Sequence, residues 1–250
     1  MGKPPCIELF AIGTELVLGR IQDTNSFWMS QRIASLGGNL RRVTLLPDDL
    51  EEIIRALQDS LTRGTDIVVT CGGLGPTPDD LTMEAVARVA RRSLTIHDAT
   101  LADYVRRRNL SGPEEVSPGL RKMATIPEGS QVFQNPAGWA PCTVVPAANA
   151  AIVILPGPPR EMEAVFTMYV ADYIASRTAN RSAALRVRVD MFESEASPVM
   201  QEVMRRCPGT YLKAYVAMRD GPTQMLPVDI VANGNSDEDV HRILREAVQQ

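Results

Sequence analysis

A glycine-rich turn that ends in two aspartates follows one apolar run of the sequence. The stretch CGGLGPTPDD, residues 71–80, comes directly after Ile67-Val68-Val69, a run that is typical of a buried strand. Glycine lets the backbone approach a ligand closely, and the N-terminus of a following helix favours an anion. We therefore expect this turn to hold a phosphate or another anionic group.

Two further turns of the same kind follow predicted strands. Gly13-Thr14-Glu15 comes after residues 6–12, and Pro156-Gly157-Pro158-Pro159 comes after residues 151–155. A single turn of this kind is also compatible with a tight connection alone. In an open parallel sheet, however, ligands bind outside the carboxyl ends of the strands. Three such turns at one edge favour a ligand site.

The aspartates of the first turn indicate a cation. Asp79 and Asp80 would repel a phosphate unless a positive charge lies between them. Either could cap the following helix, but Thr82 can also cap it, which leaves at least one carboxylate free. A divalent metal ion that bridges carboxylate and phosphate fits this arrangement.

The composition excludes several other classes of site. The chain has 250 residues, 44% of them hydrophobic, and a net charge of −4, which argues against binding nucleic acid through general basicity. The two histidines, His97 and His241, do not suffice for a multi-histidine metal centre, and the four scattered cysteines lack zinc-site spacing. No apolar run approaches the roughly 20 residues of a membrane span, and no signal peptide is recognisable. We expect a cytoplasmic protein.

Alternating strands and helices must position these turns. We expect strands at 6–12, 40–46, 67–70 and 151–155, and helices at 24–36, 49–61, 81–92 and 161–174. The middle of the chain adds a helix at 97–108, a loop at 111–119 and short strands at 132–133 and 143–146. This order indicates crossover units on a parallel sheet. After a linker at 176–182, strands at 185–192, 211–218 and 226–232 and helices at 198–206 and 238–248 form a β-α-β-β-α unit.

Several segments together resemble a known family. They are AIGTELVLGRIQDTN (11–25), TCGGLGPTPDDLTMEAVA (70–87), IPEG (126–129), NPAGWAP (135–141) and LPGPPREMEAVF (155–166). They resemble the competence/damage-inducible protein A (CinA) family and, more broadly, the molybdopterin-binding MoaB/Mog-like domain. The resemblance implies an α/β fold with two domains. Residues 1–176 would form a three-layer α/β/α domain with a mostly parallel sheet, and residues 183–250 a small α+β KH-like domain.

The same resemblance implies a function. It predicts a hydrolase, a metal-dependent nucleotide pyrophosphatase for substrates of the ADP-ribose type. The alternatives are a molybdopterin- or pterin-binding protein of molybdenum cofactor metabolism and a non-catalytic nucleotide-binding module. A divalent metal (Mg, Mn or Co), potassium as a further cation, a nucleotide or pterin ligand and a homo-oligomer are implied as well. Nucleic acid is not expected, because the KH-like unit lacks a GxxG loop.

The resemblance and the needs of pyrophosphate hydrolysis together assign residues to the site. Asp80, Asp79 and Lys122 are predicted catalytic residues, and Asp80 and Asp23 predicted metal ligands; an ordinary surface lysine is the alternative interpretation of Lys122. The predicted substrate- and phosphate-binding residues are Gly13, Thr14, Glu15, Asn25, Gly72, Gly73, Leu74, Gly75, Thr77, Thr82, Asn135, Gly138, Pro156, Gly157 and Pro159. Trp139 would either stack on a ligand ring or pack inside. Glu161 would either take part in the site or favour the dipole of its helix.

Overall fold

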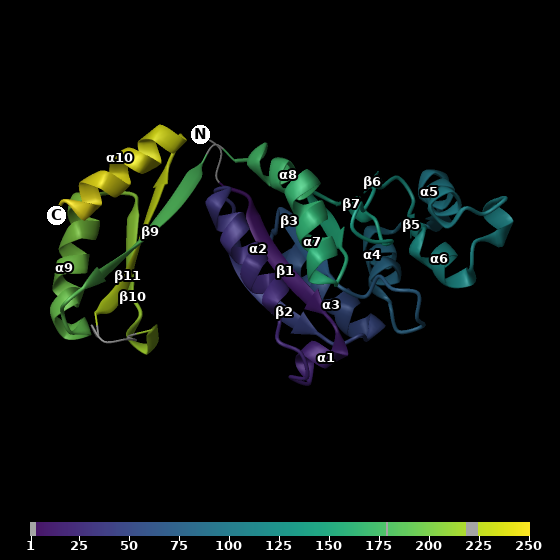
Figure 1. Cartoon of the computed structure of the whole chain (residues 1–250), viewed down its shortest axis with the longest axis horizontal. Helices are drawn as coiled ribbons and strands as arrows, with labels where there is room; N and C mark the ends of the chain where they lie inside the picture. Colours follow the sequence, from purple (N-terminus) through teal and green to yellow (C-terminus); the bar gives the residue numbers. More distant parts are fainter. Residues whose placement is uncertain (1–3, 179, 219–224) are drawn as a thin grey trace. The chain divides into compact units, whose positions relative to one another are not determined.

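The chain divides into two units (Figure 1). The computed structural model describes residues 4–178, 180–218 and 225–250. The larger unit comprises Pro5–Ile33 and Asn39–Ile174, and the smaller unit comprises Ala34–Gly38 and Ala175–Gln250 together with Pro4. Residues 1–3 of the first predicted domain, residue 179 of the predicted linker and residues 219–224 of the second predicted domain lie outside the described residues.

A mostly parallel sheet forms the centre of the larger unit, as predicted. Within the described residues its strand order is β2-β1-β3-β8-β7-β6. The strands are β1 (Cys6–Ile12), β2 (Asn39–Leu46), β3 (Ile67–Cys71), β6 (Gln131–Phe133), β7 (Cys142–Ala147) and β8 (Ala150–Leu155). All neighbours from β2 to β8 pair in parallel, and β7 runs antiparallel to β8 and β6. The carboxyl ends of β1, β3 and β8 therefore meet at one edge.

Helices cover both faces of this sheet, which confirms the three-layer prediction (Figure 1). The layers contain α2 (Thr24–Ser35), α3 (Leu50–Thr62), α4 (Thr82–Ala90) and α7 (Pro159–Val165). Helices α3 and α4 pack on the face that carries Phe10 and Val68. On the other face, the Trp28 ring of α2 meets the Phe166 ring edge-on, with 5.4 Å between centroids. Because strand side chains alternate between faces, both faces of these apolar strands are buried.

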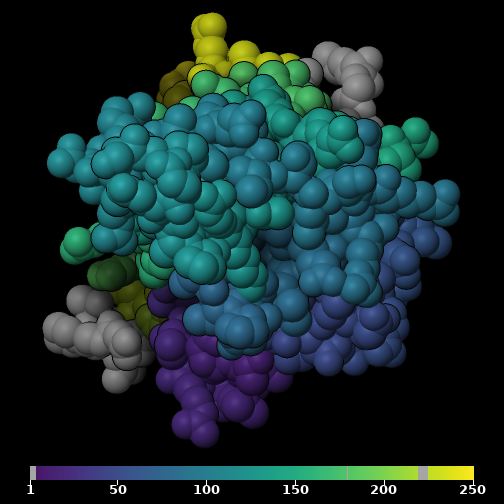
Figure 2. Space-filling view, turned by 90° about the vertical axis from the view of Figure 1, so that its right-hand side faces the viewer, coloured from purple at the N-terminus to yellow at the C-terminus, as the bar shows by residue number. Residues whose placement is uncertain are grey.

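The segment between α4 and β6 differs most from the prediction. Its elements are β4 (Leu94–Ile96), α5 (Asp98–Arg108), the 3-10 turn η1 (Pro113–Glu115), α6 (Pro118–Met123) and β5 (Thr125–Pro127). We call it the excursion; it covers much of the face shown in Figure 2. Strands β4 and β5 pair antiparallel, and the predicted loop at 111–119 holds η1 and the start of α6. The local signal for α6 is Ser117, whose side chain accepts a hydrogen bond from Leu120 N.

Two smaller departures concern single helices. Helix α1 (Thr14–Val17) follows the first glycine turn, where no helix is predicted. The helix predicted at 161–174 is interrupted by the π-helical turn η2 (Phe166–Val170) before α8 (Ala171–Ala175). The capping residue Asp49 is as predicted, because its carboxylate accepts a hydrogen bond from Glu52 N at 2.9 Å.

The smaller unit has the predicted β-α-β-β-α order. Its elements are β9 (Arg181–Val189), α9 (Glu193–Arg206), β10 (Thr210–Ala214), the 3-10 turn η3 (Val216–Met218), β11 (Leu226–Gly234) and α10 (Asp237–Val248). Strand β11 lies between β10 and β9, antiparallel to both. Helices α9 and α10 bury one face of this sheet. Strand β9 begins inside the predicted linker. Helix α9 begins before its predicted start at Pro198, so this proline lies inside the helix. Within the described ranges, no helix combines the length and apolar character needed to cross a bilayer.

Candidate functional site

The three glycine-bearing turns lie around one cavity of about 430 Å³. Gly13, Gly72 and Gly157, one from each turn, all line it. Asn25, in the first turn of α2, links two of the turns, because its Nδ2 donates to Gly157 O at 2.7 Å and to Cys71 Sγ at 3.4 Å. The structure thus brings the turns to one edge of the sheet, where the parallel topology predicts them to be.

The turn after β3 needs glycine at two positions. Gly72 and Gly73 have φ values of 105° and 65°, a region that other residues rarely adopt. A Cβ at Gly72 would also lie 2.1 Å from Ile12 O, and one at Gly73 would lie 2.3 Å from Thr82 Oγ1. The buried Thr82 fixes the turn by donating its hydroxyl to Gly72 O at 2.8 Å. The predicted ligand residue Thr82 therefore supports the turn from behind and does not line the cavity.

The fold itself uses some of the amides that are predicted to bind phosphate. Gly72 N donates to Leu155 O at 3.1 Å, and Gly13 N bonds likewise to the end of β2. Within the described part of the chain, the amides of residues 73–75 donate to no other backbone group. The amides without a backbone partner are therefore those that follow Gly72, of which Gly73 borders the cavity.

Carboxylates dominate the wall of this cavity. Five line it, namely Glu15, Asp23, Asp48, Asp79 and Asp80. Among the described residues that line it there is no lysine, arginine or histidine. A phosphorylated ligand would therefore meet negative charge at the wall and amide donors at the turn.

Hydrogen bonds to the backbone orient three of these carboxylates. Asp80 Oδ2 accepts from Thr77 N at 2.9 Å and from Thr77 Oγ1 at 2.6 Å. Asp48 Oδ2 accepts from Thr14 N at 2.8 Å, and Asp23 Oδ1 accepts from the amide of residue 26 at 2.9 Å. These bonds fix the direction of each carboxylate while using one of its oxygens. They also explain why Thr14 and Thr77, both predicted ligand residues, hold acids in place and do not line the cavity themselves.

Asp79 and Lys122 lie at the outer side of the glycine turn. Asp79 is exposed, and the Thr77 hydroxyl, with a smaller contribution from Lys122, lowers the pKa of its carboxyl group. Lys122 comes from α6 in the excursion and donates its Nζ to Thr77 O. It does not line the cavity of the three turns, which differs from the prediction of a phosphate partner there. Its partner is a backbone carbonyl because α6 packs beside the turn.

The donor set fits a hard divalent cation. Within the described residues, no group of three or more His, Cys, Asp or Glu is assembled to hold a metal ion alone. Mg²⁺ needs no such group, because it is usually held by one or two carboxylates together with water and substrate phosphate. Asp80 and Asp23, the predicted metal ligands, both line the cavity and offer carboxylate oxygens there.

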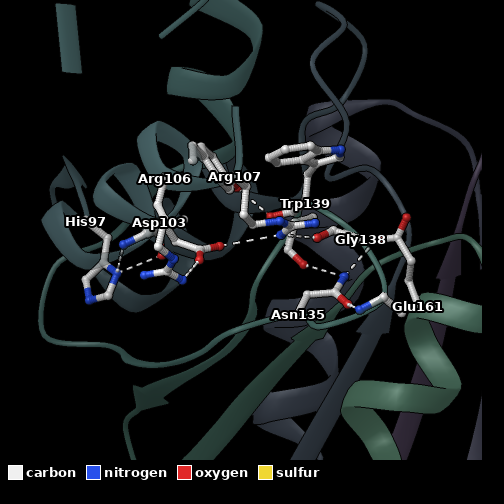
Figure 3. Close-up of polar contacts among 12 residues, drawn as sticks. His97, Asp103, Arg106, Arg107, Asn135, Gly138, Trp139 and Glu161 are labelled. Carbon is white, nitrogen blue, oxygen red and sulfur yellow. Dashed lines mark hydrogen bonds and ion pairs between the residues drawn. The ribbon is translucent and has the colours of Figure 1, made fainter. Parts of the chain in front are cut away.

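The loop at residues 135–141 is closed on itself (Figure 3) and does not line this cavity. Asn135 is buried, and its Nδ2 donates to Ala140 O at 2.9 Å and to Glu161 Oε2 at 2.7 Å. A Cβ at Gly138 would lie 1.7 Å from Glu161 Oε2, so the carboxylate packs directly on this glycine. We call Asn135, Gly138 and Glu161 the loop clamp. The structure thus gives Asn135 and Gly138 a different place from the predicted ligand site.

Burial shifts the pKa of the carboxyl group in the loop clamp. Burial raises the pKa of Glu161, and the hydrogen bond from Asn135 only partly opposes this rise. The carboxylate lies in the first turn of α7, as the sequence indicates. Its contacts with Asn135 and Gly138 add a packing role that its position in a helix could not reveal.

Trp139 packs against the excursion. Its ring lies 5.5 Å from that of Tyr104, with the rings steeply inclined, and the Arg107 guanidinium lies 4.0 Å from its centroid. Arg107 Nη1 also donates to Gly138 O at 2.6 Å (Figure 3). Of the two interpretations of Trp139, packing is the one the structure supports.

The remaining predicted residues lie at two cavities, except for Pro156. Glu15, Asn25, Gly157 and Pro159 line the cavity of the three turns, whereas Pro156 accepts a hydrogen bond from Cys71 Sγ at 3.3 Å. Leu74, Gly75 and Lys122 line a second, smaller cavity.

Sequence reasoning missed Gln22, Thr24 and Asp48, which also line the cavity of the three turns. Asp48 was detectable, because it follows β2 at the same edge of the sheet.

Comparisons with known proteins agree with this architecture. The family model described as probable molybdopterin binding domain matches residues 8–176. A protein of Pyrobaculum arsenaticum is 31% identical over 244 residues, which cover 97% of this chain and 91% of that protein. A CinA-like protein of Mycobacterium tuberculosis is 35% identical over 230 residues, which cover 86% of this chain but 53% of that protein.

A solved structure is similar to about two thirds of this chain. It is the protein CinA with unknown function from Thermoplasma acidophilum, which is 32% identical, with a TM-score of 0.63, over 68% of this chain and 98% of that one. The mostly parallel sheet with three glycine turns around an acidic cavity is thus the architecture of a probable molybdopterin binding domain. The chain belongs to the molybdopterin-binding domain family, in its CinA-like branch.

Proposed function

We propose that the protein is a metal-dependent nucleotide pyrophosphatase that acts on a substrate of the ADP-ribose type. One observation carries the proposal: five carboxylates surround a cavity with glycine amides at one side, and its described wall contains no basic side chain. A pyrophosphate cannot lie beside these acids without a cation that offsets the repulsion. The geometry therefore supports a ligand that enters as a phosphate–metal complex.

The residues of the chain would divide the work. Asp80 and Asp23 would hold the metal, with Glu15 and Asp48 close by, and the amides after Gly72 would bind the phosphate. The metal would neutralise phosphate charge and polarise a phosphoryl oxygen. Potassium, a further predicted cation, would contribute charge alone.

A water must also be oriented for hydrolysis. Glu15 folds back over the first turn, since a Cβ at Gly13 would lie 2.6 Å from its Oε1. A carboxylate held in this way can accept a proton from a water molecule in the cavity.

The first test is Asp80→Asn. The amide oxygen can still accept the hydrogen bonds from Thr77, so we expect the thermal melt to stay close to wild type. Turnover of ADP-ribose should fall by about 100-fold or more, because removing a single group that stabilises transition-state charge costs about 10²–10³ in rate in well-studied cases. Initial rates with Mg, Mn or Co, each repeated with EDTA, measure this effect.

Asp59→Asn is the matched control, because Asp59 is an exposed aspartate of α3 that does not line the cavity. It should change the rate by less than about threefold, in keeping with the small effects of exposed charges. A fully active Asp80→Asn protein, or hydrolysis that EDTA leaves undiminished, would remove the metal-dependent mechanism.

A second candidate is binding of a molybdopterin-type ligand, which the description of the matching family favours. Such a ligand also joins a ring system to a phosphate. Equilibrium binding of molybdopterin without turnover of ADP-ribose, FAD or NAD would select this alternative. Binding of a nucleotide without turnover would select a non-catalytic module. Self-association remains a prediction, which light scattering coupled to size-exclusion chromatography would check.

A further inference from the structure

A second cavity of about 150 Å³ adjoins the site. It shares Gly73 and Asp80 with the cavity of the three turns, so the two spaces meet at the glycine turn. Its volume is about that of five waters at about 30 Å³ each, well below the roughly 300–1,000 Å³ of a site for a whole small molecule. The second cavity is therefore suited to one part of a ligand.

The walls of the second cavity are chiefly apolar, unlike those of the first. The apolar side chains that line it are Leu74, Pro78, Leu81, Met83, Leu94 and Met123. They come from the glycine turn, from α4 and from the excursion, whose α6 and β4 close the far side. Thioether sulfurs make favourable contacts with aromatic rings, and flat apolar walls suit a planar ring.

The polar side chains of this cavity are Asp80, Glu84 and Thr125, which offer acceptors, and Lys122, whose Nζ donates to Thr77 O. Thr125 donates its hydroxyl to Arg121 O at 2.8 Å, which leaves its oxygen lone pairs available. Glu84 uses Oε1 for Arg88 Nη2 at 2.5 Å and retains a second carboxylate oxygen. An N–H group of a ligand in this space therefore finds acceptors at Thr125 and Glu84.

We propose that the second cavity binds the flat heteroaromatic ring, bearing an exocyclic amino group, of the ligand whose phosphates lie in the first cavity. This inference rests on the proposed function. It assigns a binding place to the ring of the substrate, whereas the acidic cavity accounts only for the phosphates. Asp80 then lies between the ring and the phosphates. Adenine and pterin share the required chemistry, since both carry an amino group on a planar nitrogen heterocycle.

The test is a pair of substitutions on one strand. Leu94 lines the second cavity, whereas Ile96, two residues on, does not, and the two side chains are equally exposed, at 41% and 40%. Leu94→Trp should fill the cavity, and Ile96→Trp is its matched control. We expect Leu94→Trp to raise the KM for ADP-ribose at least tenfold and to leave the KM for ribose 5-diphosphate, which lacks a base, unchanged. Ile96→Trp should behave as wild type with both substrates.

A second arm tests the amino group. ADP-ribose should have a lower KM than the inosine analogue, which carries a keto group in place of the amino group. Thr125→Val should narrow this difference, while Thr95→Val on the paired strand should keep it. Calorimetric titration with AMP and with a reduced pterin phosphate would distinguish the two ring sources.

The outcomes separate this inference from the proposed function. If ADP-ribose is hydrolysed and Leu94→Trp leaves its KM unchanged, the ring site is overturned and the pyrophosphatase stands. If no pyrophosphate substrate is hydrolysed, the pyrophosphatase falls, and titration of wild type and Leu94→Trp with AMP and the pterin phosphate decides the ring site. Weaker binding by Leu94→Trp supports the ring site, and equal binding or none overturns it.

Discussion

Two segments of the larger unit have similar compositions but use their polar groups differently. The turn CGGLGPTPDD and the loop NPAGWAP both combine glycine, proline and polar residues after or between strands. The first opens a cavity and leaves carboxylate oxygens and amides facing it. The second closes on itself, because the Asn135 amide and the Glu161 carboxylate are used within the loop clamp. A motif binds a ligand only where its polar groups are left without partners inside the fold.

The comparison suggests that the two segments differ in what a substitution disturbs. Changes at the cavity should reduce activity, whereas changes at the loop clamp should reduce stability and leave the folded protein active. Three substitutions test this division.

Gly72→Ala should have the largest effect, because it disturbs the cavity and the fold together. A positive φ strains alanine by about 1–3 kcal/mol, and its Cβ would lie 2.1 Å from Ile12 O, which adds overpacking of about 1–3 kcal/mol. We expect the free energy of unfolding to fall by about 2–6 kcal/mol, with loss of turnover. Urea denaturation and initial rates measure both quantities.

The matched control is Gly64→Ala, at a φ of 78° with no atom within 4 Å of the new Cβ. Its free energy of unfolding should fall only by the cost of a positive φ for alanine, about 1–2 kcal/mol, and its activity should be kept. Equal losses of unfolding free energy in the two variants would show that the contact between the new Cβ at Gly72 and Ile12 O does not affect stability.

Asn135→Ala should affect stability with little effect on catalysis. It removes the hydrogen bonds to Ala140 O and Glu161 Oε2 and the one that Asn135 Oδ1 accepts from Ala137 N at 3.0 Å. At about 1 kcal/mol each, these amount to about 3 kcal/mol. The kcat of the folded variant should stay within about threefold of wild type, since no cavity contact changes. The exposed amide of Gln58 gives the control, Gln58→Ala. A large loss of kcat at unchanged stability would place Asn135 in the ligand site after all.

Glu161→Gln should give the smallest effect, visible chiefly as a change with pH. Burial raises the pKa of Glu161, so the folded state holds this proton more tightly than the unfolded state. The stability that Glu161 contributes is therefore fully present below its unfolded pKa and is lost as pH rises through the folded pKa. The glutamine variant lacks this titration and keeps an oxygen for Asn135 Nδ2.

The measurement is urea unfolding of both proteins from pH 4 to pH 7. The free energy of unfolding of wild type, relative to that of Glu161→Gln, should be highest at pH 4 and should decrease as pH rises. If the stability of wild type relative to Glu161→Gln instead increases with pH, the hydrogen bond from Asn135, and not burial, determines the pKa of Glu161.

The sequence by itself determined the architecture of the larger unit and the edge at which its site lies. Apolar runs that alternate with capped helices imply parallel strands, and parallel strands bring their carboxyl ends, with Gly13, Gly72 and Gly157, to one side. The same reasoning could have found Asp48 at the end of β2. Each of these inferences uses local signals that a parallel sheet then brings together.

Only the tertiary structure decided which polar atoms face the cavity. The Gly72 amide bonds to Leu155 and the Asn135 amide to Glu161, partners far away along the chain. Lys122 lies beside the second cavity because the excursion folds back on the glycine turn, an arrangement that no local pattern indicated. A hydrogen bond between distant segments is fixed by the packing of whole elements, and it alone separates a ligand-binding group from a structural one.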